Sequence, residues 1–75
     1  MIKNKQYISI AELAGEFKVN KSLFLYYVEK GLLKPDTKVG GMYLFNRKQV
    51  IMIVKEIFLY KAIGLSLQEI KNKIK

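Results

Sequence analysis

Four positions in the sequence carry the signal that typically begins a helix, and each opens a segment with apolar residues at helical spacing. Ser9 to Glu12 and Ser66 to Glu69 have the form of a capping box, and Asn46 to Gln49 resembles one. Asn20 is a further candidate cap, although Leu23 cannot close a box with it. The pattern predicts four helices, over about residues 10–17, 20–30, 47–63 and 67–75.

The connections between these segments restrict how the helices pack. Only Lys18 and Val19 separate the first helix from the second. So short a link favours a helix-turn-helix, with an ordinary helical hairpin as the alternative. Gly31 and Gly64 follow the second and third segments and are placed to end them in a left-handed conformation, and Pro35 opposes continuation.

Residues 37–45 show a different pattern, with Gly40 and Gly41 at a turn and β-favouring residues after it. This pattern predicts a short hairpin, and residues 7–8 are candidates for a third strand. A structured loop is the alternative. The expected fold is mainly α: a winged helix-turn-helix of about four helices with a short β-hairpin wing. We expect one domain over residues 1–75, with residues 1–6 as a flexible tail.

The charge balance indicates a polyanionic partner, with solubility as the simpler explanation. Fourteen Lys and Arg residues oppose six acids, which gives a net charge of +8. Arg47 is the single arginine, and lysine favours phosphate contact over base reading. The chain has no Cys and no His, and its acids are scattered, so we expect no metal, no cofactor and no enzyme activity.

Several motifs together resemble the DNA-binding domain of the MerR-type transcription regulators of prokaryotes. They are Ile10-Ala-Glu-Leu-Ala14, Tyr26-Tyr27 followed by Gly31-Leu-Leu-Lys-Pro35, a wing segment from Gly41 to Phe45, and Gly64-Leu-Ser-Leu-Gln-Glu-Ile70. The resemblance covers nearly the whole chain. It implies that the second helix lies in the major groove, that the wing follows the neighbouring backbone, and that the protein is a dimer.

The chain departs from that family pattern in three places. The family usually has an arginine where Leu25 stands, and another where Tyr43 stands. These two DNA contacts cannot be transferred to this chain. The family also usually continues into a long dimerising helix and often an effector domain, and the residues up to Lys75 contain neither. We therefore expect no small-molecule effector domain in this chain.

The apolar run of the second helix divides into two faces. Leu23, Phe24, Tyr27 and Val28 share the predicted core face, and Ser22, Leu25 and Tyr26 share the other. The second face either meets DNA or packs under the wing. If it meets DNA, Leu25 can only contact a thymine methyl or fill space, so modest, A·T-biased specificity is expected. The candidate DNA-binding residues are Lys18, Asn20, Lys21, Ser22, Leu25, Tyr26, Lys34, Lys38, Tyr43, Arg47 and Lys48.

The third helix is too apolar for a single buried face. Val50, Val54, Ile57 and Ile63 are expected in the core, and Met52, Phe58 and Leu59 are candidates for self-association or for docking another protein. The alternative is that the fourth helix and the wing cover the surplus.

The expected function is double-stranded DNA binding in transcription regulation, in the cytoplasm and associated with the nucleoid. The alternatives are an excisionase-like DNA-bending factor of recombination, and a protein-docking module or anti-repressor that uses the helix at 47–63. A membrane partner is not expected, because the basic residues do not line one amphipathic helix.

Overall fold

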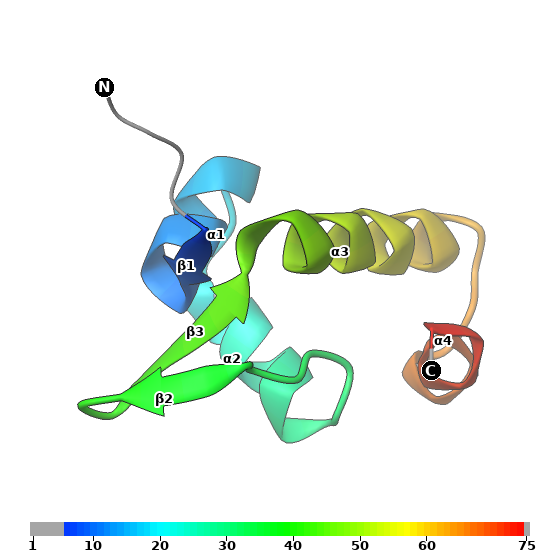
Figure 1. Ribbon diagram of the computed structural model, residues 1–75. Coiled ribbons are helices and arrows are strands. Elements are labelled where there is room, and N and C mark those ends of the chain that lie inside the picture. Colours follow the sequence, from blue (N-terminus) through cyan, green and yellow to red (C-terminus); the bar gives the residue numbers. More distant parts are fainter. Residues whose placement is uncertain (1–5, 75) are drawn as a thin grey trace.

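The computed structural model describes residues 6–74, which form four helices and a small three-stranded antiparallel sheet (Figure 1). Of the flexible tail expected over residues 1–6, residues 1–5 lie outside the described part of the chain. The carbonyl oxygen of Gln6 accepts a hydrogen bond of 2.9 Å from the Arg47 amide. In chain order the elements are β1 (Tyr7–Ser9), α1 (Ile10–Phe17), α2 (Lys21–Glu29), β2 (Thr37–Val39), β3 (Met42–Asn46), α3 (Arg47–Ala62) and α4 (Leu67–Ile74).

The predicted helix starts are confirmed by capping contacts. At α1, the Ser9 hydroxyl accepts from the Glu12 amide at 3.2 Å, and the Glu12 carboxylate accepts from the Ser9 amide at 3.1 Å. The same reciprocal pair occurs before α4, between Ser66 and Glu69. The Asn20 side chain caps α2, and the Asn46 side chain caps α3. Each cap pairs backbone N–H groups that the first turn of a helix leaves without partners.

The helix ends follow the glycines, with one exception. Gly31 (φ 82°) and Gly64 (φ 100°) take the left-handed conformation after α2 and α3, as predicted. At the end of α1 the same conformation falls on Lys18 (φ 57°), which the sequence did not reveal. The Val19 amide then donates to the Ala14 carbonyl at 3.1 Å. This turn brings α2 against α1 within three residues.

The sheet has the strand order β1-β3-β2, with both pairs antiparallel. Ile8 lies opposite Phe45 across the first pair, which confirms the third strand expected at residues 7–8. Val39 lies opposite Met42 at the end of the second pair, and Gly40 and Gly41 between them both have positive φ. This turn suits the twist of a tight hairpin, so β2 and β3 project as a wing (Figure 1).

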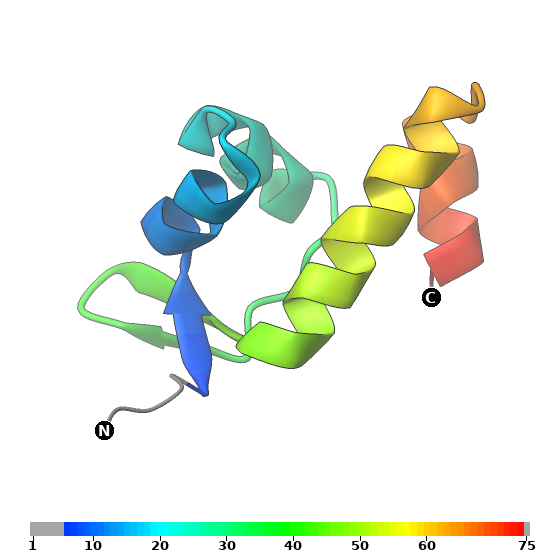
Figure 2. The same ribbon diagram turned by 90° about the horizontal axis from the view of Figure 1, so that it is seen from above.

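The core lies where α1, α2, α3 and β3 meet, and α4 packs alongside α3 (Figure 2). The prediction that Ile63 belongs to the core was wrong, because Ile63 is 65% exposed. It follows Val54 by nine residues, which is half a turn out of phase on a helix. The buried apolar residues are Ile8, Ile10, Leu13, Ala14, Phe24, Tyr27, Leu32, Leu33, Phe45, Val50, Val54, Ile57 and Ile70.

Candidate nucleic-acid interface

Helix α2 has the two faces that its sequence predicted. Phe24 and Tyr27 are buried, and Leu23 and Val28 are half-buried against the core. Burial raises the pKa of the Tyr27 hydroxyl above its usual value, and the neighbouring Tyr26 raises it further. This hydroxyl therefore stays neutral, and the buried face of α2 serves the fold.

The opposite face of α2 points to solvent. Leu25 is 44% exposed and Tyr26 is 42% exposed, beside the exposed Ser22. The ammonium of Lys30 lies 5.6 Å from the centre of the Tyr26 ring. The Ser22 hydroxyl donates to the Asn20 side-chain oxygen at 3.1 Å, which ties it to the cap. Hydroxyl, aromatic and aliphatic groups thus form one exposed surface with a cation at its edge.

The wing carries a second aromatic residue with a cation. Tyr43 on β3 lies opposite Lys38 on β2, and the Lys38 ammonium is 5.2 Å from the centre of the Tyr43 ring. Asp36, just before β2, forms two hydrogen bonds to β3. Its amide donates to the Leu44 carbonyl, and its carboxylate accepts from the Asn46 amide. The wing is therefore held in place at its base, and its tip remains exposed.

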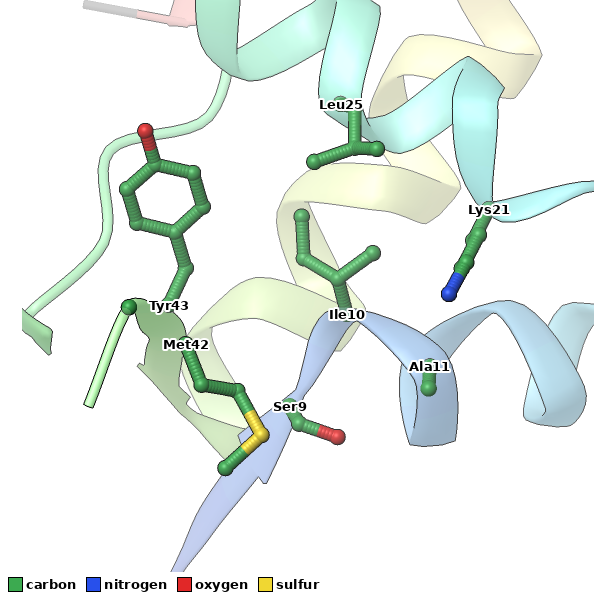
Figure 3. Close-up of a pocket in the computed structure, with 8 residues that line it drawn as sticks. Ser9, Ile10, Ala11, Lys21, Leu25, Met42 and Tyr43 are labelled. Atoms are coloured by element: carbon green, nitrogen blue, oxygen red, sulfur yellow. The ribbon is translucent and has the colours of Figure 1, made fainter. Parts of the chain in front are cut away.

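A groove of about 240 Å³ separates α2 from the wing (Figure 3). Lys21 and Leu25 border it from α2, and Tyr43 borders it from the wing. The two positions where the family resemblance implies arginine, Leu25 and Tyr43, therefore belong to one surface. The remaining lining residues were not predicted from the sequence: Ser9, Ile10, Ala11, Gly41 and Met42.

The other predicted DNA-binding residues lie outside this groove. Lys18, Lys34 and Lys48 are exposed. Arg47 is already engaged, since its guanidinium donates to the Glu16 carboxylate at 2.6 Å. The Asn20 side chain also has a structural role, because its oxygen accepts from the Ser22 amide at 3.1 Å.

The candidate partner residues of α3 do not share one environment. Met52 is 65% exposed and Leu59 is 59% exposed. Phe58 instead packs against the core, with its ring 5.6 Å from that of Phe17 and 6.3 Å from that of Phe24. It also borders an open apolar hollow whose other lining residues are Val19, Leu23, Tyr27, Lys61 and Ala62. The rest of the surplus on α3 is half-buried against the core: Ile51, Ile53 and Tyr60.

Two other kinds of site were sought among residues 6–74. No group of three or more acidic side chains there is placed to hold a metal ion. None of the described helices combines the length and apolar character that crossing a membrane requires.

Two closely joined helices, a three-stranded sheet with a projecting hairpin, and an exposed basic and aromatic face define a winged helix-turn-helix domain. Comparison with protein families matches residues 8–75 to the MerR HTH family of regulatory proteins. The chain therefore belongs to this family of DNA-binding transcription regulators, which are not enzymes. Searches of the curated proteins and of the solved structures found no match.

Proposed function

We propose that the protein binds double-stranded DNA with α2 in the major groove and with the β2–β3 wing along the neighbouring backbone. The supporting observation is the groove between them, because Leu25 on α2 and Tyr43 on the wing border the same space. A single stretch of duplex can then meet both elements at once. The phosphate contacts would come from lysines, which act as point charges.

The same geometry implies modest sequence specificity. Leu25 and Tyr43 offer no pair of donors to a guanine. Arg47 could bind a guanine only by breaking its ion pair with Glu16 or by keeping part of that pair. Ser22 and Tyr26 retain hydroxyl groups that can reach phosphate or base edges. Affinity should therefore come mostly from the backbone, at a site with an A·T bias.

The salt dependence of duplex binding tests this proposal. If about five phosphate contacts form, the logarithm of the binding constant should fall against the logarithm of salt concentration with a slope of roughly −4 to −5. Fluorescence anisotropy with a labelled duplex measures it. Lys21→Gln should reduce the slope by about 1, whereas Lys55→Gln, at an exposed position on α3, should leave it unchanged. A flat salt dependence would contradict DNA binding through this surface.

Selection of bound duplexes from a random pool separates a regulator from a recombination factor. One symmetric site would support a dimeric regulator. Several copies side by side would support the excisionase-like bending factor instead.

We also propose that the protein forms a homodimer through the exposed part of α3. Met52 and Leu59 are seven residues apart, so they lie on one side of the helix and point to solvent. Pairing this surface between two copies would remove both side chains from water. A dimer would also place two copies of α2 on the DNA, at the nucleoid.

A further inference from the structure

The groove between α2 and the wing is largely apolar, although it lies on the surface proposed to meet a polyanion. Figure 3 shows the Ile10 side chain between Leu25 on one side and Tyr43 and Met42 on the other. Lys21 provides the ammonium at the rim, and no acidic side chain belongs to the lining. The groove is thus apolar inside and positive at its edge.

The apolar walls of the groove are not covered by the chain itself. Leu25 is 44% exposed and Met42 is 52% exposed. Large apolar side chains that gather around a hollow at the surface are a common mark of a binding site. The positive rim selects an anionic ligand, and the walls select an apolar group carried by that ligand.

Among the base edges in the major groove of duplex DNA, only that of thymine places an apolar group close to a phosphate. The 5-methyl group of thymine is the apolar group there, and phosphates flank it on the same strand. A volume of about 240 Å³ equals the liquid volume of roughly eight water molecules. The groove is therefore large enough for a methyl group and the pyrimidine edge that carries it.

We propose that this groove receives the 5-methyl group of a thymine, between Leu25 on α2 and Met42 on the wing. The inference rests on the proposed docking of α2 in the major groove. The proposal explains the A·T preference by the groove, whose walls come from both α2 and the wing. Leu25 thereby takes part in recognition although it has no polar atom.

Replacement of single thymines by deoxyuridine tests the proposal, since this change removes only the methyl group. The ligand is the duplex obtained by selection from the random pool, and its affinity is measured by fluorescence anisotropy. For each bound copy of the unmodified protein, we expect one thymine whose replacement weakens binding about fourfold, because one buried methyl group is lost. Leu25→Met keeps an apolar wall and should retain this discrimination, whereas Leu25→Asn should abolish it.

Each other result overturns the proposal in a distinguishable way. Salt-sensitive duplex binding with equal affinity for thymine and deoxyuridine at every position overturns the groove site and leaves the docking of α2 standing. Unchanged discrimination in Leu25→Asn means that another surface reads the methyl group. Absence of duplex binding overturns both proposals. Circular dichroism checks that Leu25→Asn is folded, and if it is not, Met42→Gln at the opposite wall replaces it, with the same expected loss of discrimination.

Discussion

Leu25 occupies the middle of the outward face of α2, between the exposed Ser22 and Tyr26. An arginine there would carry five donors toward phosphate or guanine, whereas leucine offers only apolar area. The fold does not depend on this choice, because the side chain is 44% exposed and the core uses the opposite face of α2. What the residue changes is the chemistry of the groove that it borders.

Leu25→Arg should tighten duplex binding by about tenfold and make the salt slope steeper by about 1, because it adds a phosphate contact. Fluorescence anisotropy at several salt concentrations measures both effects. Asn72→Arg is the matched control, since it adds the same charge at an exposed position on α4 and should change affinity little. Unchanged affinity in Leu25→Arg would mean that this face of α2 does not meet DNA.

At the scale of single elements, the helix starts follow from local chemistry. Ser9 at the start of α1 and Ser66 before α4 each find their capping partner three residues away, so four consecutive letters contain the whole motif.

Removing such a cap should cost stability without changing the fold. Ser9→Ala leaves the Glu12 amide without its acceptor and should lower the free energy of unfolding by about 1 kcal/mol. For a domain of this size, that corresponds to roughly 4–8 °C in thermal melting monitored by circular dichroism. Ser22→Ala is the control, because its exposed hydroxyl hydrogen-bonds to the Asn20 side chain and does not cap a backbone N–H within residues 6–74. Its melting temperature should stay close to that of the unmodified protein. Equal losses in both variants would contradict a specific role of the α1 cap.

The cap of α4 also predicts a response to acid. The Ser66 amide and hydroxyl bond the Glu69 carboxylate and hold the pKa of Glu69 below its usual value near 4.5, with Lys73 adding to the effect. A lowered pKa in the folded state stabilises the protein above the pKa of the unfolded chain, and this contribution disappears as the pH falls through the folded value. Melting temperatures of the unmodified protein should therefore fall more steeply below about pH 4.5 than those of Glu69→Gln. Parallel curves for the two proteins would contradict this role of the charge.

The sequence predicted the helices to within one or two residues, the hairpin and the two faces of α2, because each depends on neighbours in the chain. The groove could not be predicted in this way, since residues 9–11, Lys21, Leu25 and residues 41–43 meet only after α1, α2 and the wing have packed. The ion pair between Arg47 and Glu16 joins residues 31 positions apart, and no local pattern indicates it. Lys18 at φ 57° was missed because glycine, not lysine, usually marks this conformation.

At the scale of the whole molecule, α3 connects the helix-turn-helix and its sheet to α4 (Figure 2). It carries more apolar side chains than the core buries. The structure divides this surplus. Phe58 turns inward to the rings of Phe17 and Phe24, whereas Met52 and Leu59 stay exposed. A test of association must therefore change the exposed pair, because a change at Phe58 also disturbs packing.

The double change Met52→Gln and Leu59→Gln should convert the proposed dimer to a monomer. The monomer should remain folded by circular dichroism, because both side chains are already in water in the single chain. Sedimentation velocity without DNA measures the oligomeric state. Phe58→Gln is the contrasting variant: it places a polar amide against the aromatic cluster and should lower the melting temperature whatever the oligomeric state. If the unmodified protein sediments as a monomer over the whole accessible concentration range, the exposed part of α3 is not a self-association surface. If a dimer persists after the double change, the two copies meet through another face.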